Sequence, residues 1–297
     1  MKLVIIDGNS IFHQAYHALP PLTDSKGRQT GAIAGFLNIA LALLKTAAPT
    51  HIGVVFDRGG GHRKHLLADY KANRERMDDD LHDQMIAVRK IVKLLNWKTV
   101  KVKGFEADDI VAALALQGVK EGLDTTIYSS DKDFIQLLPK GVKLYLPISK
   151  NFRTPKSIVE RYGVAAEDFL QFQIFIGDSI DNVKGFKGIG AKTAVDLINE
   201  FGTVKESVAM AHKTAKPKVR QILINSVAQA HSIEAGVTLI TDMKFKSNSL
   251  REWLRIQPYD SGKLSKFLAK FDLKQLSTRL ANEKSFEDDG EKGLFDY

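Results

Sequence analysis

The chain has 297 residues, 44% of them hydrophobic, and a formal net charge of +8. No segment approaches the roughly 20 consecutive apolar residues of a membrane span, which argues against a membrane protein. Cysteine is absent, which excludes disulfides, thiolate metal sites and cysteine nucleophiles. The N-terminus lacks the apolar stretch and cleavage site of a signal peptide, so we expect a cytoplasmic protein.

The charge is unevenly distributed along the chain. Residues 282–297 hold six acidic residues against two lysines, a net charge of −4. Because the whole chain has a net charge of +8, the other residues together carry +12. A basic body of this kind is typical of proteins that bind a polyanion such as a nucleic acid. For the acidic tail itself we expect a disordered, solubilising segment.

Short apolar runs alternate with helix-like segments in the first half of the chain. This alternation predicts a mostly parallel sheet of the α/β class, flanked by helices. One helix, after Phe105, is almost wholly apolar beyond its opening acids, which predicts a buried helix. The strand-like runs are residues 2–6, 52–57, 99–102 and 125–130, and the first long helix is residues 32–48.

Acidic residues follow these runs where a parallel sheet places its ligands. In open α/β sheets, ligands bind beyond the carboxyl ends of the strands. One aspartate there is commonly a turn former, and acids in the first turn of a helix can be simple caps. Seven acids at one edge repel one another, however, and oxygen ligands suit hard cations such as Mg²⁺ or Mn²⁺. They are Asp7, Asp57, Asp131 and Asp133 at strand ends, and Glu106, Asp108 and Asp109 at a helix start.

Residues 58–80 interrupt the α/β alternation with a basic segment. Arginine, lysine and histidine cluster at 58–65, and further cations surround Tyr70 at 70–76. The segment is either a solvated surface loop or a set of phosphate contacts beside a ring that can stack on a base. An insertion of roughly 25 residues next to a metal site favours the second interpretation.

The chain becomes helical after Pro155, so we place a domain boundary near residue 150. Asp178 and Asp181, three residues apart, can face one side of a turn and reach the acidic edge. The turn at residues 188–190 precedes a helix, and its backbone amides can receive a phosphate, with Lys192 and Thr193 adding contacts. Helices are predicted at 155–162, 165–177, 190–201 and 216–231, with little strand signal until 237–241.

Taken in register, these blocks resemble the 5′-nuclease (flap endonuclease) superfamily over roughly residues 1–275. They are most similar to the 5′→3′ exonuclease domain of bacterial DNA polymerase I and its stand-alone bacterial and phage relatives. The blocks that carry the resemblance are Ile6–Asn9, Ala15–Leu22, Phe56–Asp57, Tyr70–Arg74, Glu106–Asp109, Ser130–Asp133, Gly177–Asn182 and Gly188–Thr193.

The resemblance implies a PIN-like nuclease core at residues 1–150 with a helical arch at about 60–95. It further implies a helix-hairpin-helix (H3TH) module within residues 151–281, followed by the tail at 282–297. Because no polymerase domain follows, we expect a free-standing nuclease that acts as a monomer, in the host cytoplasm if a phage encodes it.

The resemblance also implies a chemistry, the hydrolysis of DNA phosphodiesters near 5′ ends, flaps and nicks in replication or repair. Two Mg²⁺ ions, for which Mn²⁺ can substitute, would activate water and stabilise the displacement. The first ion would be held mainly by Asp7, Asp57, Glu106 and Asp108, the second by Asp131, Asp133, Asp178 and Asp181, and Asp109 would complete the set.

Basic and aromatic residues would then contact the DNA. Lys71 and Arg74 match arch residues that grip the scissile phosphate, and Tyr70 matches a ring that stacks on a terminal base. Arg63 and Lys64 add DNA contacts. The hairpin residues Gly188, Ile189, Gly190, Lys192 and Thr193 would hold the duplex backbone, with a possible K⁺ at their carbonyls.

The chain departs from the family pattern at two places. Gln14 stands where many relatives have Arg, which removes one expected phosphate contact. Residues 183–185 read Val-Lys-Gly where relatives usually read Ile-Pro-Gly. Neither change alters a predicted metal ligand, so we expect an active enzyme.

The expected partner is branched or nicked duplex DNA, with RNA–DNA primers as a further substrate. The apolar end of the tail, Leu294-Phe295, suggests docking on a sliding clamp or other replication protein. Two alternatives are a PIN-type ribonuclease that cuts single-stranded RNA, and a non-catalytic protein that binds branched DNA. The hairpin argues against the first alternative, and the complete set of acids argues against the second.

Overall fold

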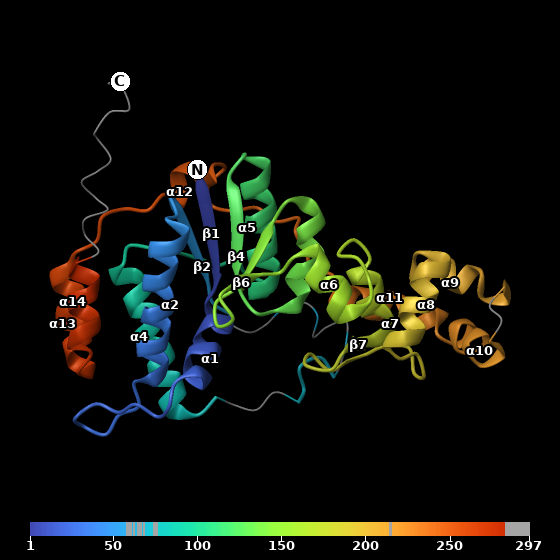
Figure 1. Ribbon diagram of the computed structural model, residues 1–297, viewed down its shortest axis with the longest axis horizontal. Coiled ribbons are helices and arrows are strands. Elements are labelled where there is room, and N and C mark those ends of the chain that lie inside the picture. Colours follow the sequence, from blue (N-terminus) through green and yellow to red (C-terminus); the bar gives the residue numbers. More distant parts are fainter. Residues whose placement is uncertain are drawn as a thin grey trace.

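A computed structural model describes residues 1–57, 61, 63, 67, 69–73, 77–213 and 216–282. Its centre is a six-stranded sheet in the order β3-β2-β1-β4-β5-β6 (Figure 1). Strands β1 to β5 are parallel and β6 is antiparallel, which confirms the predicted sheet. The strands are β1 Lys2–Asp7, β2 His51–Val55, β3 Lys98–Val100, β4 Asp124–Tyr128, β5 Lys143–Leu146 and β6 Asn151–Phe152.

The central strand β1 is buried on both of its faces. Leu3 and Ile5 point into the core that contains α5, whereas Val4 and Ile6 point into the core that contains α1 and α2. This alternation follows from the two-residue period of a strand, and burial on both faces explains the continuous apolar run in the sequence. The helices that cover the sheet are α1 Gly8–Ala18, α2 Gly31–Ala47, α4 Asp79–Leu94 and α5 Ala107–Lys120.

Helix α5 is the buried helix that the sequence predicts. Its residues from Ala107 to Ala115 are all buried except Asp108, which is half-buried. Gly118 lets it approach the sheet closely, because a Cβ at this position would lie 2.5 Å from Leu3 Cδ2. The packing therefore fixes the place at which the helix begins, and with it the three acids of its first turn.

Part of the segment expected to form the arch, residues 79–94, is a helix that packs against the core. Helix α4 buries Met85, Val88 and Ile91 in the core with α2, so residues 79–94 flank the sheet rather than arch over it. Between residues 58 and 76 the described residues are Gly61, Arg63, Leu67 and 69–73.

The second half is helical, as the sequence predicts, with three differences. The helix expected from residue 165 begins at Phe169, and the one expected over 216–231 is split at Ser226. Residues 238–241 form no strand, and side chains bind the backbone groups of Thr238, Leu239 and Ile240 instead. The elements are η1 Lys132–Lys140, α6 Pro155–Tyr162, α7 Phe169–Ile176, β7 Gly177–Asp178, β8 Val183–Lys184, α8 Ala191–Phe201, α9 Val204–Ala209, η2 Ala211–Lys213, α10 Pro217–Asn225 and α11 Val227–Val237.

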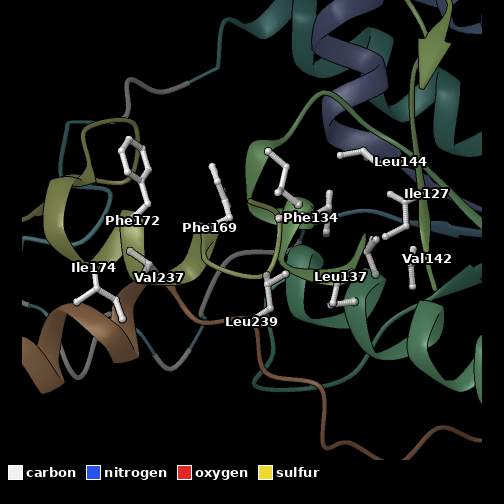
Figure 2. Close-up of a cluster of buried hydrophobic side chains, with 14 of the residues drawn as sticks. Ile127, Phe134, Leu137, Val142, Leu144, Phe169, Phe172, Ile174, Val237 and Leu239 are labelled. Carbon is white, nitrogen blue, oxygen red and sulfur yellow. The ribbon is translucent and has the colours of Figure 1, made fainter. Parts of the chain in front are cut away.

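One apolar core continues from the sheet into this helical half. Ile127 of β4 and Phe134 of η1 share a cluster with Phe169 of α7 and Val237 of α11 (Figure 2). A shared core of this kind holds the helical half firmly against the sheet. The division at residue 150 stays a prediction.

The chain then returns to the sheet. The Ile52 amide donates to the Leu254 carbonyl at 2.9 Å, and the Ile256 amide donates to the Thr50 carbonyl at 3.0 Å. Beyond this contact a helical pair packs on the outer side of α2 and α4 (Figure 1). The last elements are α12 Leu250–Trp253, α13 Ser261–Leu268, η3 Ala269–Phe271 and α14 Lys274–Asn282.

Among the helices of the described residues, none has the length and apolarity to cross a membrane.

The shared core makes a quantitative prediction about stability. Phe134→Ala should lower the free energy of unfolding by about 3–5 kcal/mol, because the ring is fully buried and its loss leaves a cavity. Ile86→Ala, at a side chain that is half exposed, should change it by no more than about 0.5 kcal/mol. Urea denaturation of both variants measures the difference, and equal losses would contradict the packing described here.

Candidate active site

The carboxyl edge of the sheet gathers the strand-end acids, as predicted. The Asp7 carboxylate accepts hydrogen bonds from the Ser10 amide at 3.0 Å and from the Ser129 hydroxyl at 2.8 Å. Asp131 follows β4, and its side chain caps η1 by accepting from the Asp133 amide at 2.9 Å. Asp57 follows β2. Backbone and hydroxyl donors therefore fix the Asp7 and Asp131 carboxylates before any ligand binds.

The helical half contributes the other acids through the short β7–β8 hairpin. Asp178 lies at the end of β7, where Lys132 Nζ contacts its carboxylate at 3.0 Å. Asp181 follows in the turn, and Lys71 Nζ lies 3.5 Å from its carboxylate. The Lys71 amide donates to the Asp181 carbonyl at 3.0 Å, which ties the basic segment to this turn.

Seven of the nine predicted metal ligands line one cavity of about 720 Å³. Four cationic side chains line the same cavity, and two of them, Arg153 and Arg161, were not anticipated from the sequence. The cavity thus combines acids for a metal with cations for a phosphate. The seven acids are Asp7, Asp57, Asp108, Asp131, Asp133, Asp178 and Asp181.

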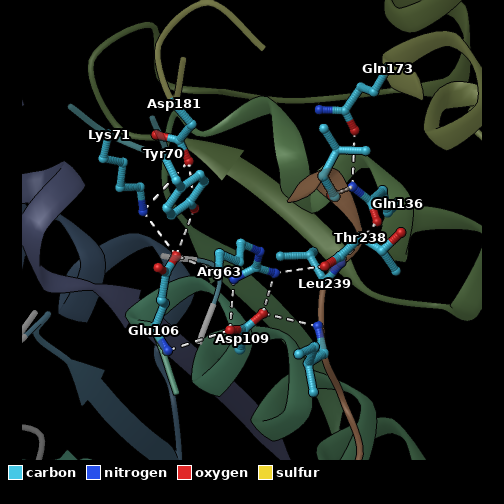
Figure 3. A network of polar contacts seen from close by, with 12 residues as sticks. Arg63, Tyr70, Lys71, Glu106, Asp109, Gln136, Gln173, Asp181, Thr238 and Leu239 are labelled. Atoms are coloured by element: carbon cyan, nitrogen blue, oxygen red, sulfur yellow. Dashed lines mark hydrogen bonds and ion pairs between the residues drawn. The ribbon is translucent and has the colours of Figure 1, made fainter. Parts of the chain in front are cut away.

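The other two predicted ligands, Glu106 and Asp109, are absent from the cavity lining, and other side chains bind them instead (Figure 3). Glu106 Oε2 accepts from Tyr70 Oη at 2.8 Å, Lys71 Nζ at 2.9 Å and Arg63 Nη1 at 3.2 Å. Asp109 is fully buried and pairs with Arg63 through both of its oxygens. Glu106 lies next to the cavity, through Lys71, whereas Asp109 faces the interior.

Burial and mutual repulsion raise the pKa of several of these acids. Burial raises the pKa of Asp7 to about 6, with a further increase from Asp131. Burial also raises the pKa of Asp108 and of Asp133 well above the ordinary value, and the Asp131 carboxylate is the next cause for both. The pKa of Asp131 is raised as well, again by burial. Burial is the largest cause of these raised pKa values, and a cation bound in the cavity would offset its cost.

This donor set fits hard divalent cations, because every available ligand atom is a carboxylate oxygen. In the described part of the chain, no three acids already have the close arrangement that would coordinate a metal ion. Lys132 and Lys71 take up part of the negative charge at Asp178, Asp181 and Glu106. A bound ion would therefore compete with these lysines for the same oxygens.

Of the predicted DNA contacts in the basic segment, Lys71 lines the cavity, whereas Arg63 and Tyr70 do not. Arg63 is 3% exposed and its guanidinium is bound to Asp109, a placement that differs from the expected DNA contact. The Tyr70 ring is also 3% exposed, so the face needed for base stacking is covered. Arg74 and Lys64 lie outside the described residues.

The predicted hairpin is present before α8. Ile189 is buried and anchors the turn, and its amide donates to the Phe186 carbonyl at 2.9 Å. Gly188 has a φ of +96°, which explains the need for glycine there. Gly190 and Lys192 are exposed at the start of α8, where free backbone amides can meet an anion.

Several polar residues of the site were missed by sequence reasoning. Gln14 donates to Ser10 Oγ at 2.8 Å and to Ser130 Oγ at 2.7 Å, so it joins α1 to the loop that follows β4 at the cavity edge. Lys132 stands between two predicted ligands, and that spacing was an available signal. Gln173 donates to Asp133 at 2.6 Å, a contact that no local sequence pattern indicates.

Comparisons with known proteins agree with this geometry. Residues 2–163 match the family described as 5′–3′ exonuclease, N-terminal resolvase-like domain, and residues 164–262 match 5′–3′ exonuclease, C-terminal SAM fold. The chain is 32% identical to a 5′–3′ exonuclease of Aquifex aeolicus over 297 residues, covering 99% of each protein. It is 35% identical to DNA polymerase I of Caldicellulosiruptor bescii, covering 94% of this chain and 33% of the polymerase.

The chain thus spans about a third of the length of that polymerase relative. Among solved structures, it is similar to the bacteriophage T5 flap endonuclease in a complex with DNA and metal ions. The TM-score is 0.67 at 20% identity, over 94% of this chain and all of the other. This likeness confirms the predicted fold class.

The raised pKa values predict how pH affects the metal-free protein. The folded state holds protons on these acids more tightly than the unfolded state, whose Asp pKa is near 3.8. Stability should therefore fall as pH rises from about 4 through about 6 and above, as the buried acids ionise. The melting temperature in EDTA should be lower at about pH 7.5 than at about pH 5, and Mg²⁺ should reverse most of this loss.

Asp7→Asn is the matched control, because it removes one ionisation without changing the size of the side chain. Its melting temperature in EDTA should depend less on pH than that of the parent protein. A parent protein whose stability rises between about pH 5 and about pH 7.5 in EDTA would contradict the electrostatic description.

Proposed function

Because the chain belongs to the 5′–3′ exonuclease family, we propose that it hydrolyses DNA phosphodiesters near 5′ ends, flaps and nicks during replication or repair. The observation that supports this most directly is the single cavity in which seven carboxylates and four cations meet. Carboxylates alone would repel DNA, so their presence is useful only if metal ions bind between them and the phosphate. This argues against a protein that merely binds branched DNA.

Two metal ions, Mg²⁺ or Mn²⁺, would occupy the cavity. Bound there, they supply an activated water and stabilise the charge of an in-line displacement. The residues proposed to hold the first ion are Asp7, Asp57, Glu106 and Asp108, and those proposed for the second are Asp131, Asp133, Asp178 and Asp181. Glu106 would bind the first ion by sharing its oxygens between that ion and the side chains that now donate to it.

Lys71 is the cation best placed to serve both the acids and the substrate. Its ammonium lies between Glu106 and Asp181 and lines the cavity. Burial alone would lower the pKa of Lys71, but Asp181 and Glu106 raise it overall, so the side chain stays charged. We assign it to the scissile phosphate, together with Arg74. Tyr70 keeps its proton, because burial and the neighbouring acids raise its pKa, and it donates to Glu106.

The duplex beyond the cleavage site would lie on the hairpin. Exposed Lys184, Lys187 and Lys192 surround this turn, and Gly190 leaves its amides open. Such a surface reads the DNA backbone rather than its sequence. It also favours duplex DNA over single-stranded RNA, the substrate of the rival PIN-type ribonuclease.

Other features of the function stay proposals. They are a K⁺ ion at the hairpin, the use of RNA–DNA primers, action as a monomer, and a cytoplasmic location. The acidic tail, which the sequence suggests for clamp docking, lies beyond the described residues.

A labelled 5′-flap substrate tests the proposed function. The protein should release a short 5′ product in Mg²⁺ and none in EDTA, because the acids need a divalent ion to approach the phosphate. The same label on single-stranded RNA of matched sequence is the control. Equal cutting of that RNA, or product formed in EDTA, would overturn the assignment.

The Asp108→Asn variant tests the centre of the site. The rate of cleavage should fall by at least about 100-fold, the usual scale for losing one electrostatic contribution to a transition state. Binding of the flap DNA should be kept, since one negative charge is removed from beneath the phosphate.

Asp124→Asn is the matched control for that measurement. Asp124 lies at the opposite edge of the sheet, where it forms an exposed pair with Lys143. Its rate should equal that of the parent protein. Comparable rates for the two variants would show that the catalytic centre lies elsewhere.

A further inference from the structure

The segment of residues 237–240, which we call the crossing segment, begins at Val237, the last residue of α11, and pairs with no strand of the described residues. Buried side chains from two sides bind its backbone instead (Figure 3). The Thr238 carbonyl accepts from Arg63 at 2.6 Å, and the Ile240 amide donates to Asp109 at 2.9 Å. The Val237 carbonyl accepts from Gln136 at 2.9 Å. The backbone of this strand-like sequence thus forms hydrogen bonds with buried side chains in place of a neighbouring strand.

On the first side, Arg63 and Asp109 form a buried, two-pronged pair. Nη1 lies 2.9 Å from Oδ2 and Nη2 lies 2.7 Å from Oδ1. Each Asp109 oxygen has a second donor, the Ile240 amide on Oδ1 and the Glu106 amide on Oδ2. Asp109 is fully buried and does not line the cavity, so metal binding by Asp109 would break a saturated set of contacts.

The same pair acts on Glu106. Arg63 Nη1 donates to Glu106 Oε2 at 3.2 Å, while Asp109 receives the Glu106 backbone amide. Asp109 therefore holds the backbone end of Glu106. Arg63 and Tyr70, which do not line the cavity, hold its carboxylate together with Lys71, which does. Gly61 closes the remaining space, because a Cβ there would lie 2.2 Å from the Glu106 carboxylate.

On the second side, two glutamines continue the chain of contacts to Asp133. Gln136 donates from one amide nitrogen to the Val237 carbonyl and to Gln173 Oε1, each at 2.9 Å. Gln173 uses its own amide nitrogen to donate to Asp133 Oδ1 at 2.6 Å. Because its oxygen is already taken by Gln136, the Gln173 amide can present only its nitrogen to the acid.

We propose that Arg63, Asp109, Gln136 and Gln173 are positioning residues that act through the crossing segment. They hold Glu106, from the first group of acids, and Asp133, from the second, at a fixed separation. The proposal rests on the proposed two-metal function, and it gives Asp109 and Arg63 roles other than metal ligand and DNA contact. Partners of this kind orient ligating carboxylates, and their loss usually weakens metal binding by roughly 10–100-fold.

The crossing segment also joins the acids to the DNA-binding half. It begins at the last residue of α11, and α11 packs on α7 and on the β7–β8 hairpin that carries Asp178. The helices that would receive the duplex and the groups that orient Glu106 and Asp133 thus share one short piece of backbone.

Gln173→Met tests the proposal, because it keeps the length and apolar packing of the side chain but removes the donor to Asp133. Gln171→Met is the matched control on the same helix, where the Gln171 oxygen accepts a hydrogen bond from the Val204 amide at 2.9 Å and binds no acid of the described residues. Mn²⁺ binding without DNA is measured by electron paramagnetic resonance, with the melting temperature in EDTA as a check on folding.

Gln173→Met should weaken Mn²⁺ binding and raise the half-saturating Mg²⁺ concentration for flap cleavage by roughly 10–100-fold. The rate at saturating Mg²⁺ and the affinity for flap DNA in EDTA should stay within about twofold. Gln171→Met should leave metal binding unchanged. Equal Mn²⁺ affinities for both variants would overturn the proposal, whatever their melting temperatures.

Asp109→Asn supplies a second, independent test. A direct metal ligand would lose Mn²⁺ affinity whether or not Arg63 is intact. A positioning residue should show coupling instead, so that Asp109→Asn adds less than about twofold once Arg63→Met is present. Additive losses would return Asp109 to the metal ligands. The parent protein distinguishes failure of this proposal from failure of the proposed function. If the parent protein did not cleave the flap in Mg²⁺, the proposed function itself would be refuted.

Discussion

Repulsion among buried and half-buried carboxylates is the constraint on which the rest of this structure depends. Seven of them line one cavity, and burial together with their neighbours raises the pKa of Asp7, Asp108, Asp131 and Asp133. A fold can keep such a cluster only if its backbone is fixed elsewhere and cations are at hand. Lys71 and Lys132 supply part of that charge, and bound metal ions would supply the rest.

The fixed backbone comes from the apolar core. Strand β1 is buried on both faces, and helix α5 is pressed against it at Gly118, so the acids at their ends cannot move apart. The same core runs through Phe134 into α7 and α11 (Figure 2). Packing energy thus offsets the electrostatic cost of bringing the acids together, as expected where a functional site conflicts with stability.

The strands and the acids of the cavity could be predicted because their signals are local. Each buried strand is an apolar run, and Asp7, Asp57 and Asp131 stand just beyond such runs. The roles of Arg63 and Tyr70 were harder to predict, because a cation or a ring in a basic segment looks the same whether it is exposed or buried. Their burial depends on partners, Glu106 and Asp109, that lie about 40 residues away in the chain.

The sequence by itself determined the α/β core, the family and the edge at which the acids gather, since periodicity and strand ends are properties of neighbouring residues. Only the tertiary structure decided which acids face the cavity and which face inward. Asp109 pairs with Arg63, and the backbone of residues 237–240, a strand-like run in the sequence, forms hydrogen bonds with buried side chains. Those outcomes depend on which hydrogen-bond partners folding brings together, and no local pattern contains that information.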